Sequence, residues 1–85
     1  MKPEEFYEVM VSAEAASITE IDKIAGAIAE AFDADWFSKC GPGANVRVNF
    51  SNRYAATAFW GASQFNDLNP ATPAWLIAAE PHRAA

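Results

Sequence analysis

The chain has 85 residues, with six Lys or Arg against eleven Asp or Glu, so its formal net charge is -5. This length suits one small domain and excludes a large multi-domain enzyme. The acidic balance argues against direct binding to nucleic acid, which normally needs a basic surface.

A first helix is expected before residues 14–17. Residues 2–5 carry a proline and two acids, which suit a first helical turn and its dipole. Phe6, Met10 and Ala13 then recur at helical spacing. The same run also has residues that favour strands, so a strand is the alternative.

A second helix is predicted to start at the capping box Ser17-Ile18-Thr19-Glu20. It should fade near residues 33–37 and stop before Gly41-Pro42-Gly43. This glycine-containing segment precedes a strand and is interpreted as a turn, not a phosphate loop. The helix has one apolar stripe, formed by Ile18, Ile21, Ala25, Ile28 and Phe32.

The second half of the chain changes to a period of two. Val46, Val48 and Phe50 alternate with polar residues, which predicts a strand with one buried face. A turn at residues 51–53 is expected to lead into a second strand over residues 54–60. A turn one residue longer would exchange the two faces of that second strand.

Residues 75–79 are expected to add a third strand, because a lone hairpin is only marginally stable. The alternative is a short helix begun by Thr72-Pro73 and ended by Pro81. The predicted fold class is therefore α+β, with two N-terminal helices packed on a small two- or three-stranded antiparallel sheet. We expect a single small domain over 1–85, with a helical half (1–40), a sheet half (44–80) and a flexible tail (81–85).

The sequence offers little material for catalysis or for metal binding. His82 is the only histidine and Cys40 the only cysteine, so a catalytic triad or a zinc site has few groups to use. Glu30, Asp33 and Asp35 lack the spacing of a calcium loop and are interpreted as a solvated helix end. We expect no enzyme activity, no catalytic residues, no metal and no cofactor.

Two further features leave alternatives open. Cys40 is interpreted as a small, partly buried thiol, and the alternative is a reactive or dimer-forming thiol. Arg47, Tyr54 and Trp60 would share one face of the predicted hairpin. They are either core residues covered by the helices or a stacking platform for single-stranded nucleic acid.

The charges divide unevenly along the chain. Residues 1–35 hold nine acids and two bases, giving -7, whereas residues 36–85 hold two acids and four bases, giving +2. The helical half is therefore a concentrated anionic surface. Such a surface either serves solubility or docks to a basic patch on another protein. An anion-binding patch near Arg47 and Arg53 also stays open.

In its size, its acidic amphipathic N-terminal half and its lack of a catalytic set, the chain resembles the small phage-encoded inhibitors of the anti-CRISPR type. The resemblance is one of general character over the whole chain, and no motif carries it. It implies a non-enzymatic protein that binds a basic surface of another protein such as a Cas subunit. The acids would then block a surface that otherwise contacts nucleic acid, with no direct contact to nucleic acid or membrane. Because residues 1–5 carry acids where a signal peptide has an apolar run, and no run is long enough to span a membrane, we expect a cytoplasmic location, in the host cell if phage-encoded.

Under this hypothesis the contacts come from acids near both ends of the helical half and from two aromatic anchors. The predicted partner-binding residues are Glu4, Glu5, Glu8, Glu30, Asp33, Asp35, Trp36 and Phe37. The alternative function is a homodimerising accessory or scaffold domain of a phage or bacterial assembly. Such a domain would pair through its aromatic sheet face, and the sequence leaves monomer and homodimer open.

Overall fold

The computed structural model describes residues 6–12, 18–41 and 43–78 of the chain. Over these residues the fold is α+β, as expected, with helices on a three-stranded antiparallel sheet. In chain order, the elements are β1 (Tyr7–Ser12), α1 (Ile18–Ala31), β2 (Trp36–Cys40), β3 (Asn45–Phe50), α2 (Arg53–Phe65) and α3 (Ala74–Ala78).

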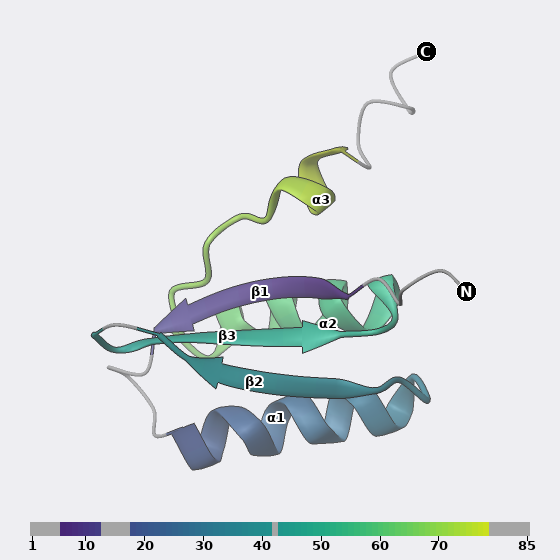
Figure 1. The fold of residues 1–85 in the computed structure, drawn as a ribbon, viewed down its shortest axis with the longest axis horizontal. Coiled ribbons are helices and arrows are strands. Elements are labelled where there is room, and N and C mark those ends of the chain that lie inside the picture. The colour runs from purple at the N-terminus through teal and green to yellow at the C-terminus, as the bar shows by residue number, and fades with distance from the viewer. Residues whose placement is uncertain (1–5, 13–17, 42, 79–85) are drawn as a thin grey trace.

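The sheet has the strand order β1-β3-β2, with β3 in the centre and antiparallel to both neighbours. β1 and β2 therefore run parallel to each other, and α1 connects them across β3 as a split βαβ unit (Figure 1). Tyr7 and Trp36 both pair with Phe50. The starts of β1 and β2 and the end of β3 thus lie at the same end of the sheet.

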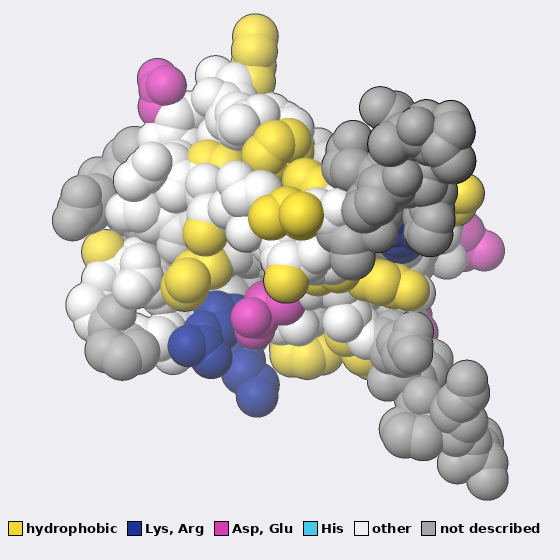
Figure 2. Space-filling view, turned by 90° about the horizontal axis from the view of Figure 1, so that it is seen from above, with side chains coloured by type: hydrophobic (Ala, Val, Ile, Leu, Met, Phe, Trp, Pro, Cys, Tyr) yellow, Lys and Arg dark blue, Asp and Glu magenta, His cyan; other side chains and the backbone are white. Residues whose placement is uncertain are grey.

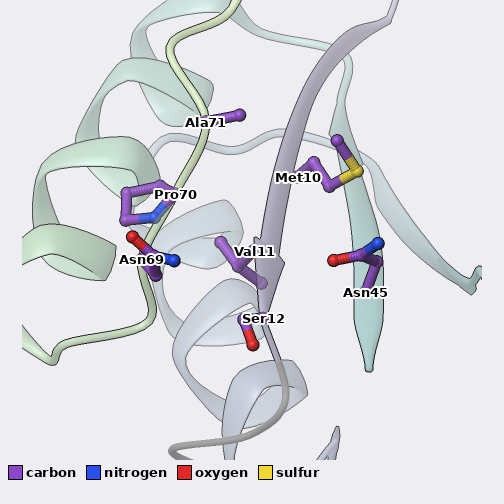
Figure 3. Close-up of a pocket in the computed structure, with 7 residues that line it drawn as sticks. All are labelled: Met10, Val11, Ser12, Asn45, Asn69, Pro70 and Ala71. Atoms are coloured by element: carbon purple, nitrogen blue, oxygen red, sulfur yellow. The ribbon is translucent and has the colours of Figure 1, made fainter. Parts of the chain in front are cut away.

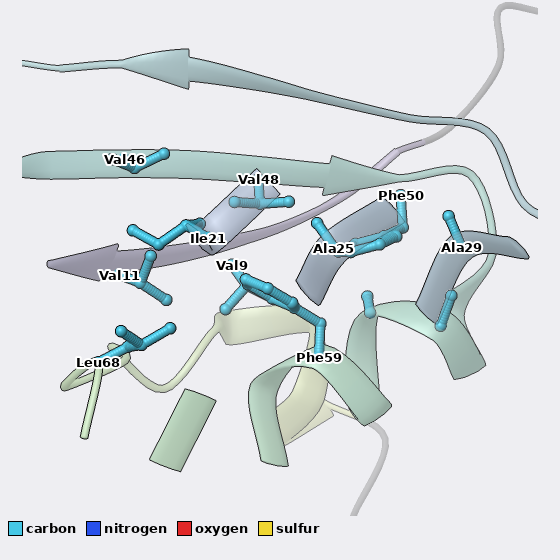
Figure 4. Close-up of a cluster of buried hydrophobic side chains, with 12 residues drawn as sticks. Val9, Val11, Ile21, Ala25, Ala29, Val46, Val48, Phe50, Phe59 and Leu68 are labelled. Carbon is cyan, nitrogen blue, oxygen red and sulfur yellow. The ribbon is translucent and has the colours of Figure 1, made fainter. Parts of the chain in front are cut away.

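Both long helices cover one face of the sheet. Alternate strand residues point to that face and are fully buried there, among them Val9, Val48 and Phe50. They pack with Ile21 of α1 and Phe59 of α2 in one apolar cluster (Figure 4). The opposite face of the sheet carries the residues between them and is called here the open face.

The expected first helix is wrong over the described residues, because residues 7–12 form strand β1. Val9 and Val11 alternate with Met10 and pair with Val48 and Val46 of the central strand. This alternation agrees with burial of one strand face, whereas the helical spacing of Phe6 and Met10 does not. Residues 1–5 and the capping residue Ser17 lie outside the described part.

The expected second strand over residues 54–60 is also wrong, because this run lies in α2. Asn52, interpreted as a hairpin turn residue, is the helix N-cap. Its side-chain oxygen accepts hydrogen bonds from the backbone N–H groups of Tyr54 (2.7 Å) and Ala55 (3.3 Å). Burial at Ala55, Phe59 and Ser63 follows a helical period.

The chain after α2 lies where a fourth strand would pair with β1. The Ser12 N–H donates to the carbonyl of Leu68 (2.9 Å), and the Ala71 N–H donates to the carbonyl of Met10 (3.0 Å). Between these two hydrogen bonds the segment advances by three residues, from Leu68 to Ala71, while β1 spans only two, from Met10 to Ser12. The extra residue defines a bulge, and Asn69 has a left-handed φ of 53° there. We call residues 68–71 the edge segment.

The third strand expected over residues 75–79 is wrong for its described part, because residues 74–78 form the short helix α3. Trp75 of this helix packs edge-on against Tyr7, with ring centroids 5.5 Å apart. Its indole N–H also donates to the carbonyl of Glu8 (2.9 Å). The third strand of the sheet is β2 instead, in a segment where the second helix was expected to fade.

Candidate protein-binding surfaces

The end of α1 gathers acidic and aromatic side chains at one end of the sheet, shown on the right in Figure 1. Glu30, Asp33 and Asp35 are all exposed there. Phe32 is 40% exposed, and Tyr54, in the first turn of α2 at this same end, is 73% exposed. We call these five residues the acidic end.

The backbone holds Asp33 and Asp35 in defined positions. The N–H of Asp33 donates to the carbonyl of Glu30 (3.2 Å), and that of Ala34 to the carbonyl of Ala29 (2.8 Å). These two bonds form a Schellman motif, in which Asp33 takes the left-handed position with a φ of 54°. Asp35 is fixed by Ser51, which receives its N–H on Oγ (2.9 Å) and donates its own N–H to the Asp35 carbonyl (2.9 Å).

The acids of this end lie near the C-terminal end of α1, where the helix dipole makes negative charge unfavourable. The C-terminal end of α1 carries the negative pole of the helix dipole, and its last turn contains no basic residue. Arg53, which precedes Tyr54 at the start of α2, is itself exposed. The acidic end is therefore suited to bind a cationic surface, which would relieve the repulsion between its own carboxylates.

The open face is a second surface, made by the outward side chains of all three strands. Across its first row, Glu8 and Phe37 flank Asn49, which is only 8% exposed. Phe37 is 40% exposed and meets Phe6 edge-on, with ring centroids 5.2 Å apart. This row lies at the same end of the strands as the acidic end.

The next row of the open face is basic. Met10, Arg47 and Lys39 lie side by side in the strand register, with Arg47 in the centre. The Lys39 ammonium lies 5.9 Å from the centroid of the Phe37 ring, a cation–π distance. Figure 2 shows dark-blue side chains gathered beside a magenta one along the lower edge of the molecule.

The predicted partner-binding residues therefore divide among three places. Glu30, Asp33 and Asp35 belong to the acidic end, and the acids Glu4 and Glu5 lie outside the described residues. Glu8 and Phe37 lie on the open face. Trp36 lies on the helix side of the sheet, where it packs against the apolar cluster, and a Cβ added at Gly26 would lie 3.5 Å from its ring.

The predicted platform of Arg47, Tyr54 and Trp60 is not formed. Arg47 lies on the open face, whereas Tyr54 and Trp60 lie on α2, which packs on the opposite face. Trp60 packs against the core, and its indole N–H donates to the carbonyl of Ala71 (3.2 Å). The cation beside Arg47 is Lys39, not Arg53, because residues 36–40 form a strand.

Phe32, Tyr54 and Lys39 are surface residues that the sequence did not place among the protein-binding residues, and Tyr54 was considered only for the stacking platform. The sequence carries no clear signal for Lys39, because Trp36-Phe37-Ser38-Lys39 does not alternate apolar with polar residues. It carries none for Phe32 either, because the spacing of Phe32 from Ile28 fits the apolar stripe of α1. The stripe ends one residue too early for Phe32 to be buried, since α1 stops at Ala31.

A shallow groove of about 410 Å³ lies between the edge segment and the end of β1 (Figure 3). Its lining residues are Met10, Val11, Ser12, Asn45, Asn69, Pro70 and Ala71. This lining combines apolar side chains with one hydroxyl and two carboxamides. It contains neither a carboxylate nor a histidine or cysteine that could act as an acid, base or nucleophile.

Among the described residues, no group of three or more His, Cys, Asp or Glu side chains could hold a metal ion. His82 lies outside these residues, and Cys40, expected to be partly buried, is exposed at the end of β2. In the described part of the chain, no helix has the length and apolar character needed to cross a membrane. Comparison with protein-family models, curated proteins and solved structures found no significant match.

Proposed function

We propose that this protein is a non-enzymatic inhibitor that binds another protein through its acidic end. The observation that supports the proposal is the convergence of Glu30, Asp33 and Asp35 with two exposed aromatic rings, Phe32 and Tyr54. Aromatic residues often provide the energetic centre of an interface, while surrounding charges set orientation and association rate. The acidic end combines both kinds of group on one small area.

The partner surface proposed is basic and binds nucleic acid when the inhibitor is absent. The Schellman motif fixes the backbone of Asp33, and hydrogen bonds with Ser51 fix that of Asp35. The carboxylates of these residues can occupy the Lys and Arg sites that otherwise bind phosphates. This mode agrees with the general resemblance to anti-CRISPR proteins, and a Cas subunit in the host cytoplasm is the partner class we propose.

The test is inhibition of purified Cas effector complexes, loaded with guide RNA, by stoichiometric amounts of the protein. Target DNA binding is measured by gel shift or fluorescence anisotropy, with the inhibitor added before the target. We expect the wild-type protein to block target binding by at least one effector. Failure with every effector tested would overturn the assignment to this partner class.

The residues are tested by charge reversal with a matched control. Asp33→Lys with Asp35→Lys should weaken binding to the inhibited effector by about 10- to 100-fold, because two attractive charges become repulsive. Asp67→Lys is the control, since Asp67 has the same left-handed conformation (φ 60°) at the end of α2. Unchanged affinity of the double variant at low salt would exclude the acidic end as the binding surface.

A further inference from the structure

The open face exposes apolar and charged side chains that the fold itself does not use. α1 and α2 pack on the opposite face, and Phe37 remains 40% exposed. Lys39 and Arg47 are directly opposite each other on neighbouring strands. Like charges in such a pair destabilise a sheet, and no carboxylate of the described residues forms an ion pair with either.

The charges of this face are ordered along the strands. Glu8 lies in the row of Asn49 and Phe37, and Asp35 extends β2 by one further pair with Ser51. Alternation along the strand places Asp35 on the same side as Phe37. The face is therefore acidic at the end where β2 starts and basic one row further along.

From this order we infer that the open face binds the open face of a second copy of this chain. A two-fold axis that lies between the stacked sheets and runs perpendicular to the strands reverses the strand direction of the second copy. The acidic row of each copy then lies over the basic row of the other. This axis keeps each strand over its equivalent, so Glu8 lies over Met10 of the second copy and beside Arg47 on the neighbouring strand. The long side chains of Glu8 and Arg47 can meet there, and symmetry repeats the contact.

The same arrangement accounts for the apolar residues of the face. Reversal about this axis brings Phe37 of one copy over Lys39 of the other, which extends the cation–π contact already present within each chain. The ring of Phe37 and the side chain of Met10 lose their contact with water. A self-complementary face of this kind is what a two-fold interface requires.

A second copy fits better than the other occupants of such a face. A nucleic acid or an acidic peptide would be attracted by Lys39 and Arg47 but repelled by Glu8 and Asp35. A partner that offers a base near Glu8 and an acid near Arg47 complements both rows, and the chain itself is such a partner. This inference shares Asp35 with the acidic end, so its test uses Glu8 and Arg47, which belong to the open face alone.

The interface is small, so the dimer is expected to be weak. Three strands about 4.8 Å apart and about five residues long cover roughly 250–400 Å² on each copy. Stable interfaces bury about 800 Å² on each partner. We expect a dissociation constant of roughly 10–100 μM, which rises with ionic strength.

The test is sedimentation equilibrium of the full chain from about 5 to about 500 μM, a range that brackets the expected dissociation constant. Glu8→Arg and Arg47→Glu should each raise the dissociation constant at least about tenfold. An equimolar mixture of the two variants should restore association, because both contacts between positions 8 and 47 of a mixed dimer then join an acid to a base. Arg53→Glu, which changes an exposed cation off this face, is the control and should leave the dimer unchanged.

Three results would overturn the inference. They are a wild-type protein that is monomeric at the highest concentration, a mixture that associates no better than its components, and binding of an oligothymidylate that Arg47→Glu abolishes while the protein stays monomeric. Circular dichroism verifies that each variant is folded. If Arg47→Glu does not fold, Arg47→Gln replaces it in the mixture with Glu8→Arg, which should then associate more tightly than Glu8→Arg alone.

Discussion

Asp33 and Asp67 occupy equivalent backbone positions after α1 and α2. Each has a positive φ, and each is followed by a residue whose N–H donates to a carbonyl five residues earlier, Ala34 to Ala29 and Leu68 to Ser63. Glycine is the usual residue at this position because it has no Cβ to strain the left-handed conformation. An aspartate there also places a negative charge at the negative pole of the helix.

We therefore expect Asp33→Gly and Asp67→Gly each to raise the free energy of unfolding by about 0.5–1 kcal/mol. Urea denaturation followed by circular dichroism measures the effect. The two variants should differ in function, because only Asp33 belongs to the acidic end. A loss of stability in both would mean that local hydrogen bonds of the aspartates outweigh the backbone strain.

Asn52 stabilises the start of α2 through hydrogen bonds to its neighbours in the chain. It caps α2 by accepting from two backbone N–H groups that the helix itself leaves without partners. Asn52→Ala should lower the free energy of unfolding by about 1 kcal/mol, and Asn52→Asp should largely preserve it. Equal stability of all three proteins in urea denaturation would rule out a capping role.

At the scale of elements, the edge segment replaces a regular fourth strand. Leu68 anchors it, since this side chain is only 1% exposed and packs in the core. Leu68→Ala should lower the free energy of unfolding by about 2–4 kcal/mol through loss of buried surface and creation of a cavity.

The same substitution should loosen the pairing of the edge segment with β1. Hydrogen exchange at the Ser12 amide reports this pairing, because that amide donates to the Leu68 carbonyl. We expect its exchange in Leu68→Ala to accelerate more than that of Val48, an amide of the central strand. Equal acceleration at both sites would show that the edge segment opens only with the whole sheet.

The sequence predicted the elements whose apolar residues follow one dominant period. It missed those in which helical and strand spacing compete and a distant partner decides between them. The apolar stripe of α1 and the alternation of β3 decide those two elements locally. The run that contains β1 has Phe6 and Met10 at helical spacing and Val9 and Val11 at strand spacing, and pairing with β3 decides between them. Propensity cannot supply that information, because the partner strand lies about forty residues away.

α2 was missed for a different reason. Asn52 followed by an alternating apolar run resembles a hairpin turn, yet asparagine is equally favoured as a helix cap. The alanine content of residues 55–58 favours a helix and was the better signal. The candidate surfaces depended on these elements. The sequence indicated the exposed position of Glu30, Asp33 and Asp35 at the end of α1, whereas the row of Lys39 and Arg47 needed knowledge of β2.

For the whole molecule, the expected helical and sheet halves are interleaved. Residues 1–40 supply two of the three strands as well as α1, and the later half supplies the central strand and α2. The apolar cluster draws on both. Neither half can therefore bury its apolar side chains without the other.

We expect urea unfolding in one cooperative transition, with tryptophan fluorescence and circular dichroism midpoints that coincide. The three tryptophans report on separate places, since Trp36 lies in β2, Trp60 in α2 and Trp75 in α3. For a protein of this size, the slope of free energy with urea should be about 1 kcal/mol/M. Midpoints that separate would show that one part of the chain unfolds independently.

The bulged edge segment also bears on how the sheet can grow. Strands at both edges of a sheet can recruit further chains, and a molecule with two such edges can polymerise without limit. Here β1 has its outer carbonyls at Met10 and Glu8 occupied by Ala71 and by the Trp75 indole. Pairing with a strand of another chain is then confined to the edge formed by β2. Two copies that pair through β2 leave no further β2 edge open, so the assembly stops at a dimer. By covering the β1 edge, the bulged segment at Asn69 and Pro70 thus opposes the growth of fibres through edge-to-edge pairing.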